Sequence, residues 1–322
     1  MRGRPTVIYL DVGSVATLRI RIPIVSLGSG RPILSILCGV HGDETAGLMA
    51  SYRFIKYLST ADSVRGSVRI ITAANPFAQA TRSRIALSDF YDLNRIGEGK
   101  PDGTLTERVA HALFEFLGDS TLVIDLHEFR MDTPIMAIYI PSERTETDRA
   151  VLESIAAFGP AVVWSMNLSR PEEVQYSGSL VAALVRSGVA SFGVETSRVA
   201  VLSDETIDHV ADGLYRVAQN LGIVEGKPKV SSVVAYDRKV ITADVAGLWE
   251  PVRSILDQVK ETDIVGRLVS LHLTSEEHVI AGAAGTILQL ARHQLVDTGA
   301  NLFAIGIVNE EVTEALHSVV AR

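Results

Sequence analysis

The sequence predicts an α/β protein with a mixed, largely parallel sheet flanked by helices, followed by a smaller C-terminal β domain. Short apolar runs alternate with segments of helical periodicity between residues 33 and 220, as in sheets whose strands are joined by crossover helices. The pattern changes near Gly226-Lys227-Pro228-Lys229, after which short strand-like runs are separated by turn residues. We therefore predict two domains, comprising residues 1–228 and 229–322.

The elements of the first domain are expected in a regular order. Two strands precede residue 26, around 7–10 and 18–22, and the second alternates polar and apolar residues as a half-exposed strand does. Thr104-Leu105-Thr106-Glu107 has the pattern of a capping box, which predicts a helix through about Leu117. The loop 77–101 is too long for a simple connection and is typical of a functional or a disordered segment. Further strands are expected at 33–39, 68–72, 121–124, 135–140, 161–164 and 189–194, and further helices at 44–58, 151–158, 180–185 and 207–217.

The second domain is expected to consist of short strands and one closing helix. Its turn-rich pattern favours antiparallel pairing over crossover connections. The expected strands are 232–236, 240–242, 264–271, 279–281, 285–290 and 302–307, and the helix is 310–319.

Composition excludes several classes of protein. The 322 residues are 47% hydrophobic, which is enough for a large core. The formal net charge of −8, with no run of Lys or Arg, argues against a nucleic-acid or anionic-membrane partner. Cys38 is the only cysteine, which excludes an intrachain disulfide and a cysteine-based zinc site. Without a long apolar stretch or an N-terminal signal pattern, the expected location is cytoplasmic.

The turn from Cys38 to Gly47 carries the first polar pair of interest. It follows the apolar run 33–37 and precedes a helical segment, a place where α/β folds often hold their chemistry. His41 and Glu44 are three residues apart, so both can point to one side and share a cation. Alone, the pair is equally compatible with a solvated surface turn.

Two further polar side chains follow other predicted strands. His127 comes after the strand at 121–124, and Glu195 comes after the strand at 189–194. Because parallel strands end at one edge of the sheet, we expect these side chains near His41 and Glu44. Two imidazoles and one carboxylate, with a fourth position open to water, form a catalytic zinc shell. A carboxylate outside the shell can then serve as general base.

Five motifs follow one another along the chain: His41-Gly42-Asp43-Glu44, Asn75-Pro76, Asp92-Leu93-Asn94-Arg95, Asp125-Leu126-His127 and Gly193-Val194-Glu195. In this order, they resemble the motifs of the succinylglutamate desuccinylase/aspartoacylase family, a branch of the zinc carboxypeptidase-like fold. The resemblance covers roughly residues 30–220. It extends less specifically to the C-terminal β domain, which would cap or flank the active site.

The resemblance implies a role for each matching residue. His41, Glu44 and His127 would bind one Zn²⁺ per chain, and Glu195 would activate the zinc-bound water and then protonate the departing amine. Asn94 and Arg95 would hold the substrate carboxylate, which suits the planar fork of arginine. Arg84, with Arg82 as its competitor, would polarise the scissile carbonyl. Asp92 would accept a hydrogen bond from the free ring nitrogen of His41 and fix its tautomer.

Structural alternatives remain for the same residues. His127 could be a core histidine, Glu195 could pair with Arg198, and Asn94 with Arg95 could cap a turn. Arg82 and Arg84 could be solvated loop charges. The sequence also departs from the family where Ile96-Gly97-Glu98-Gly99 replaces an aromatic-Pro-Gly turn, and where Thr196 and Ser197 follow the glutamate. These departures leave the identity of the substrate open.

The sequence therefore predicts a zinc-dependent deacylase that cleaves the amide bond of a small N-acylated amino acid or a related acid. The alternative within the same chemistry is a metallocarboxypeptidase acting on peptide C-termini. The alternative of another class is a non-catalytic metal-binding or scaffold protein. We expect the protein to bind a small-molecule N-acyl substrate and neither a nucleic acid nor a membrane. The sequence leaves open whether the protein forms a homo-oligomer. Tyr236 and His278 are candidates from the second domain to reach the cleft.

Overall fold

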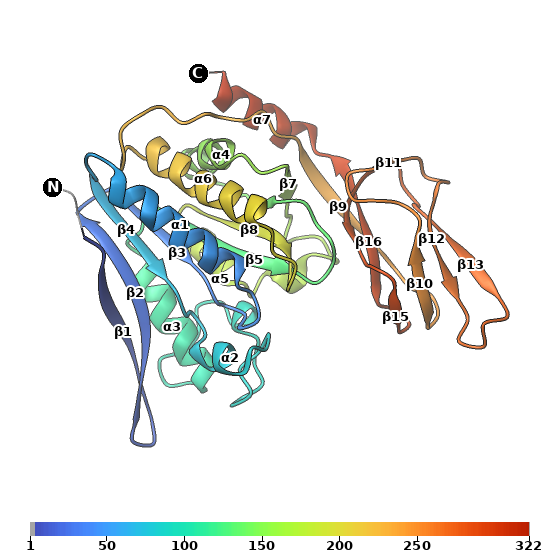
Figure 1. Cartoon of the computed structure of the whole chain (residues 1–322), viewed down its shortest axis with the longest axis horizontal. Helices are drawn as coiled ribbons and strands as arrows, with labels where there is room; N and C mark the ends of the chain where they lie inside the picture. The colour runs from blue at the N-terminus through green and yellow to red at the C-terminus, as the bar shows by residue number, and fades with distance from the viewer. Residues whose placement is uncertain (1–3, 322) are drawn as a thin grey trace.

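The computed structural model describes residues 4–321 and contains one large and one small sheet (Figure 1). The large sheet has twelve strands in the order β1-β2-β4-β3-β5-β8-β6-β7-β9-β16-β14-β11. Their bounds are β1 Thr6–Val15, β2 Leu18–Ser29, β3 Ile33–Leu37, β4 Gly66–Ile71, β5 Leu122–Phe129, β6 Met136–Tyr139, β7 Val162–Ser165, β8 Ser191–Arg198, β9 Ala235–Thr242, β11 Gln258–Val259, β14 Gly285–Leu290 and β16 Asn301–Val308.

Parallel pairing at the centre of the sheet positions the site. The run β4-β3-β5-β8 is parallel throughout, so the turn after β3 lies at the same edge as the ends of β5 and β8. Strand β6 is antiparallel to β8, and β6, β7 and β9 form a second parallel run. The predicted fold class, a mixed and largely parallel sheet flanked by helices with a smaller β part, is confirmed.

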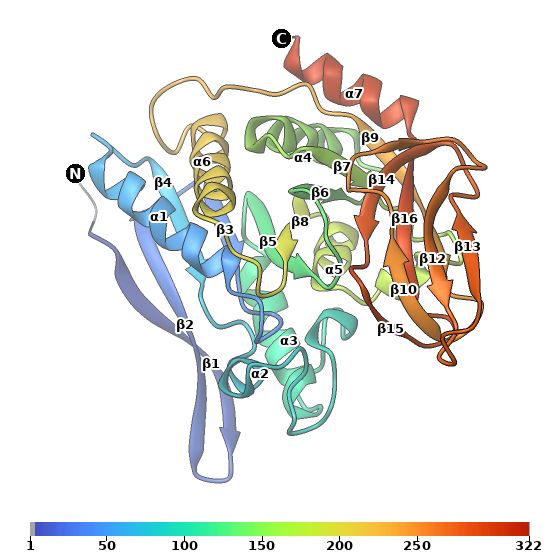
Figure 2. The same ribbon diagram turned by 45° about the vertical axis from the view of Figure 1, so that its right-hand side comes forward.

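Helices cover both faces of the sheet. On one face α1, α4, α6 and α7 lie side by side and bury one hydrophobic cluster that includes Phe54, Phe158 and Leu316 (Figure 2). On the other face α3 and α5 bury a second cluster that includes Leu113 and Leu184. The helices are α1 Ala46–Thr60, α2 Pro76–Thr81, α3 Leu105–Leu117, α4 Thr145–Phe158, α5 Leu180–Ser187, α6 Asp204–Asn220 and α7 Glu310–Val320, with short 3-10 helices η1 Leu93–Arg95 and η2 Val174–Tyr176.

The C-terminal part combines strands of both sheets. The small sheet has the order β13-β12-β10-β15, and a third cluster containing Trp249 and Phe303 is buried between it and the end of the large sheet. Its strands are β10 Gly247–Pro251, β12 Ile264–Val269, β13 Glu276–Ile280 and β15 Gln294–Val296. Strand β9 pairs with β7, so the large sheet is continuous from the N-terminal part into the C-terminal part. The division into domains at residue 228 stays a prediction.

Several predicted elements differ from those observed. Strands β5 and β8 are longer than expected, so His127 and Glu195 lie within strands and do not follow them. The loop 77–101 is not wholly irregular, because it begins inside α2 and contains η1. The capping box at Thr104 is confirmed, with reciprocal hydrogen bonds between Thr104 and Glu107. Strands β10, β11 and β15, which have two to five residues each, are missing from the prediction. Within residues 4–321, none of the helices has the length and apolarity needed to cross a membrane.

Candidate active site

The turn between β3 and α1 places His41 and Glu44 close together. Gly39 has φ +73, a conformation that favours glycine. A Cβ on Gly42 would lie 2.0 Å from the carbonyl group of Ala78, so only glycine lets the turn pass the start of the 77–101 loop. The turn is anchored from β5, because the Glu128 carboxylate accepts hydrogen bonds from the backbone N–H groups of Thr45 and Ala46, each at 2.5 Å.

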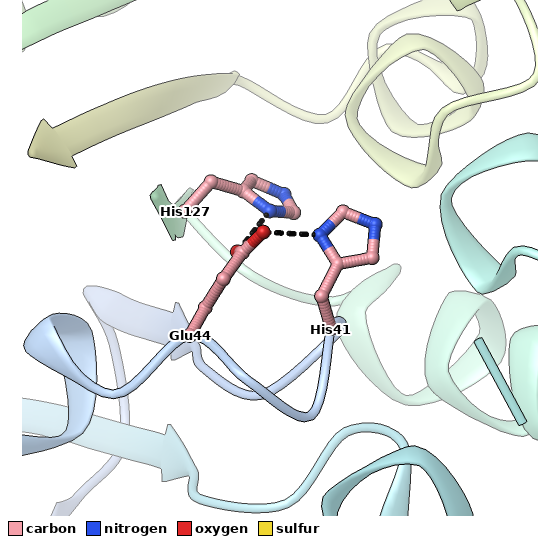
Figure 3. Close-up of side chains that lie close together, drawn as sticks. All are labelled: His41, Glu44 and His127. Atoms are coloured by element: carbon pink, nitrogen blue, oxygen red, sulfur yellow. Dashed lines mark hydrogen bonds and ion pairs between the residues drawn. The ribbon is translucent and has the colours of Figure 1, made fainter. Parts of the chain in front are cut away.

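His127 on β5 completes a group of three buried side chains (Figure 3). The Oε1 atom of Glu44 lies 2.6 Å from Nδ1 of His41, and its Oε2 atom lies 3.0 Å from Nδ1 of His127. One ligand atom from each residue falls within 4.8 Å of the others. All three residues are at most 6% exposed, so a cation here would be largely shielded from solvent.

The Nε2 atom of each histidine, which is the ring nitrogen farther from Glu44, faces a different aspartate. Nε2 of His41 lies 3.2 Å from Oδ1 of Asp92, and Nε2 of His127 lies 2.9 Å from Oδ2 of Asp125. A carboxylate at Nε2 keeps the proton on that nitrogen, which leaves Nδ1 as the free electron pair. In the neutral rings that metal binding requires, both free pairs would point to where a cation beside Glu44 would lie. Without a metal, burial opposes protonation of both rings, but the neighbouring carboxylates outweigh burial and raise the pKa of His41 and of His127, so each Nδ1 can carry a proton and donate it to Glu44.

The electrostatics of the group suit a divalent cation. Burial alone would raise the pKa of Glu44, but His127 and His41 outweigh burial and lower this pKa to about 2. Glu44 is therefore ionised at neutral pH, as a metal-ligating carboxylate must be. Two imidazole nitrogens and one carboxylate are a donor set that zinc accepts, so the residues fit the cofactor that the sequence predicts.

Glu195 on β8 stands beside the group. It is the register partner of His127 across the parallel pair β5–β8 and is 7% exposed. Burial is the largest influence on its carboxyl group and raises its pKa to about 7. Among the described residues, none donates a hydrogen bond to its buried Oε2 atom. This carboxylate can therefore exchange a proton near neutral pH and has an oxygen free to do so.

The 77–101 segment brings the other predicted residues to the same cavity. The Nε and Nη2 atoms of Arg84 lie 3.1 and 3.0 Å from Oδ2 of Asp92, and Arg84 lines the cavity. Asn94 and Arg95 also line it, and the Arg95 guanidinium lies 5.1 Å from the centre of the Tyr176 ring. Arg82 ends α2 in the left-handed conformation and is exposed.

Arg198 does not pair with Glu195 in the way the structural alternative supposed. Its Nε atom lies 3.2 Å from Oδ1 of Asp132, and Arg198 does not line the cavity.

These side chains surround one cavity of about 550 Å³, which is large enough for a small-molecule substrate. Its lining residues are His41, Glu44, Arg84, Asn94, Arg95, Asp125, His127, Glu128, Phe129, Arg130, Met131, Ile138, Ile140, Trp164, Met166, Tyr176, Ser179, Val181, Gly193, Glu195, Gln294 and Asn301.

Sequence reasoning missed several residues of the site. Asp125 lies in the Asp125-Leu126-His127 motif, but the sequence prediction assigns it no role, although residues two apart on a strand share a face. Gln294 and Asn301 line the cavity from the C-terminal part, whereas Tyr236 is buried in the core and His278 is exposed. Gln294 and Asn301 are the first residues of β15 and β16, and no local pattern in the sequence distinguishes them from other polar residues at strand ends.

Comparison with known proteins gives the same family as the sequence motifs. The model of the succinylglutamate desuccinylase/aspartoacylase catalytic domain matches residues 31–221. The N-alpha-acetyl-L-2,4-diaminobutyric acid deacetylase of Halomonas elongata is 25% identical over 271 residues, which cover 81% of this chain and 77% of the relative.

Solved structures share the fold. A succinylglutamate desuccinylase/aspartoacylase from Rhodobacter sphaeroides superposes with a TM-score of 0.82 at 20% identity, covering 95% of this chain and 96% of its own. The product-bound ectoine utilization protein EutE (DoeB) from Ruegeria pomeroyi also has a TM-score of 0.82, at 22% identity, covering 95% of this chain and 98% of its own. With its catalytic-domain match over residues 31–221, this chain belongs to the succinylglutamate desuccinylase/aspartoacylase family.

Proposed function

We propose that this protein is a zinc-dependent deacylase that hydrolyses the amide bond of a small N-acylated amino acid or a related acid. The observation that carries the proposal is the buried group of His41, Glu44 and His127 beside Glu195, in a cavity of small-molecule size. Membership of a family of desuccinylases and aspartoacylases, and a relative named as a deacetylase, support hydrolysis of an acyl bond.

In this proposal His41, Glu44 and His127 hold the zinc ion. Bound zinc supplies Lewis acidity, which acidifies a water molecule and polarises an amide carbonyl. The two histidines would bind through Nδ1, because Asp92 and Asp125 occupy the side of Nε2.

Glu195 moves the proton. Its carboxylate takes a proton from the attacking water and then delivers it to the nitrogen of the departing amine. A pKa near 7 suits both halves of this task, since the carboxyl group then accepts and releases a proton with similar ease. Its unpartnered Oε2 atom is the oxygen available for this exchange.

Arginines of the 77–101 segment orient the substrate. Arg95, with Asn94, would hold the substrate carboxylate through a forked pair of hydrogen bonds. Arg84 would donate to the carbonyl oxygen as negative charge develops there. Its contact with Asp92 fixes its guanidinium. Because Asp92 also contacts His41, this carboxylate links Arg84 to a proposed zinc ligand.

The test measures metal content and turnover on the same protein. Protein purified without chelator and reconstituted with zinc should hold about one zinc ion per chain. It should release amine from N-acetyl or N-succinyl amino acids, and Glu195→Ala should keep the metal but lose turnover. Stoichiometric zinc with no turnover on any substrate would support a binding protein. Turnover on peptides alone would support a carboxypeptidase, and the absence of bound metal after reconstitution would remove the proposed centre.

A further inference from the structure

We propose that the end of the cavity beyond Glu195 selects substrates whose amino-acid side chain is apolar and uncharged. The inference rests on the proposed function, because it assigns a substrate class to the same site. Three observations support it: the residues that form the cavity wall at this end are apolar, buried contacts hold them in place, and the wall adjoins Arg95.

The wall is formed by β6, by β7, by the residues just after these two strands, by η2 and by α5. Its residues are Ile138, Ile140, Trp164, Met166, Tyr176 and Val181. Four of them belong to a buried hydrophobic cluster, and Ile138 and Tyr176 pack against it. The wall is thus the open surface of a core cluster, and among the described residues that form it none is charged.

The aromatic part of this wall is held in place from behind. Trp164 Nε1 donates a 2.7 Å hydrogen bond to Oε1 of Glu173, which is fully buried. The Arg238 guanidinium stacks 3.6 Å from the centre of the Trp164 ring and donates to the Tyr176 hydroxyl at 3.0 Å. Arg238 is 5% exposed and does not line the cavity, so it fixes both rings and offers no charge to a ligand. A surface fixed in this way loses little conformational entropy on binding.

The wall adjoins the position proposed for the substrate carboxylate. Arg95 packs over the ring of Tyr176, and the Tyr176 and Trp164 rings meet edge to face at 5.4 Å. A carboxylate held by Arg95 is one bond from the α-carbon, so the side chain on that carbon lies against the aromatic wall. The acyl group is several bonds farther away, on the other side of the scissile bond.

Gly193 lies between Glu195 and the wall. It lines the cavity and pairs with Ile138 across β8 and β6. Since Gly193 is two residues before Glu195 on the same face of β8, the cavity surface runs from Glu195 over Gly193 to Ile138 of the wall.

Apart from Arg95, which is assigned to the substrate carboxylate, the basic residues Arg84 and Arg130 of the cavity are paired with aspartates. Arg84 is paired with Asp92, and Arg130 donates a 2.6 Å hydrogen bond to Asp43.

Glu128 uses Oε1 on the backbone of the α1 turn, and its Oε2 atom has no hydrogen-bond partner among the described residues. Apart from the unpartnered oxygens of Asp125 and Glu195, which belong to the proposed metal centre and base, this Oε2 atom is the rival partner for a cationic substrate side chain. Moving a charged side chain from water onto the apolar wall without a partner would be strongly unfavourable, whereas an aliphatic or aromatic side chain gains by burial.

The experiment compares N-acetyl amino acids on the zinc-reconstituted protein. The apolar set contains the leucine, methionine and phenylalanine derivatives, and the charged set contains the aspartate, lysine and 2,4-diaminobutyrate derivatives. We expect kcat/KM to be at least about tenfold higher for the apolar set. Equal or higher values for any charged derivative would overturn the inference while leaving the deacylase proposal intact, and preference for the cationic derivatives would assign the selecting role to Glu128.

A binding measurement separates the two proposals. Titration calorimetry with Glu195→Gln, which keeps the shape of the side chain, ranks the same compounds without turnover. If the wild type hydrolyses none of them but the variant binds the apolar set more tightly, hydrolysis fails and the selectivity stands. If the variant binds the charged set more tightly, or binds none of the compounds, the selectivity is overturned.

A substitution in the wall provides the residue-level test. Ile138→Phe narrows the cavity, so the ratio of kcat/KM for the leucine derivative to that for the alanine derivative should fall about tenfold. Ile8→Phe makes the same change at a 45% exposed position on the edge strand β1 and should leave this ratio unchanged. An unchanged ratio in Ile138→Phe would show that the substrate does not reach the wall.

Discussion

The Oδ2 atom of Asp125 lies 2.9 Å from Nε2 of His127, two residues farther along β5. Both side chains leave the same face of the strand, and Asp125 is fully buried. The proposed metal ligand and the group that orients it are therefore fixed by one short stretch of regular backbone. The equivalent partner of His41, Asp92, comes from a different segment 51 residues away in sequence.

The first prediction concerns this pair. Asp125→Asn should raise the dissociation constant for zinc about 10- to 100-fold, because the amide no longer holds the Nε2 proton with a full negative charge. Competition with a chromophoric chelator measures the effect, and Asp92→Asn should act in the same direction. Asp119→Asn, at an exposed aspartate paired with Arg69, is the control. Unchanged zinc affinity in Asp125→Asn would mean that Asp125 does not orient His127.

The second prediction is the acid limb of the pH profile. Burial raises the pKa of Glu195 to about 7, and a general base works only when deprotonated. Activity should therefore be full above this pKa and should fall about tenfold per pH unit below it. Because a bound cation favours the ionised carboxylate, the limb of the metal-loaded enzyme should lie at or below pH 7. A profile of kcat/KM from pH 5 to 9 tests this, and a limb well above pH 7 would contradict the assignment.

The third prediction distinguishes two neighbouring arginines. Arg84→Gln should lower kcat by about 10²- to 10³-fold, because it removes a donor to the developing oxyanion. Arg82→Gln makes the same change two residues away, at an exposed side chain, and should leave kcat unaltered. Steady-state kinetics of both variants decide between them, and the reverse result would transfer the role to Arg82.

The fourth prediction concerns metal removal. Zinc at about 100 times its dissociation constant should stabilise the fold by about 2.7 kcal/mol, since it binds the assembled group and not the unfolded chain. A chelator should therefore lower the melting temperature of the wild type and of Glu195→Gln alike. His127→Ala should show little further decrease on chelation. A full decrease in His127→Ala would indicate that zinc binds elsewhere.

The fifth prediction tests the anchor of the α1 turn. Glu128→Ala removes the acceptor of two backbone N–H groups at the start of α1 and should lower the free energy of unfolding by about 2 kcal/mol. Glu128→Gln keeps an acceptor oxygen and should cost less. Urea denaturation of the two variants measures the difference. Equal losses would show that the hydrogen bonds at this turn contribute little.

Much of the candidate site could be predicted from the sequence because polar residues there interrupt strongly apolar strands. His41, Glu44, His127 and Glu195 each stand where a buried run reaches the same edge of a parallel sheet. Asp125 was harder to interpret, because the strand was predicted to stop at residue 124. With β5 extended to Phe129, its pairing with His127 follows from the two-residue period of a strand.

The far wall of the cavity could not be predicted, for a different reason. Trp164 and Met166 have the sequence pattern of any buried strand. Whether their side chains face a cavity depends on whether other residues pack against them, which the local sequence does not show. The small sheet presents a similar difficulty. Its strands are short, and Pro251 and exposed Leu248 in β10 obscure the alternation that marks longer strands.

The pairing of β7 with β9 has a consequence for any attempt to divide the chain. Cutting near residue 228 would remove β9. The N–H and C=O groups of β7 that face β9 would then be unpaired, along an apolar strand that includes Val163 and Trp164, while those that face β6 stay paired. Such an open edge is a template for intermolecular strand addition, so the truncated fragment should aggregate. The C-terminal segment thus protects the sheet that bears the site, in addition to lining the cavity.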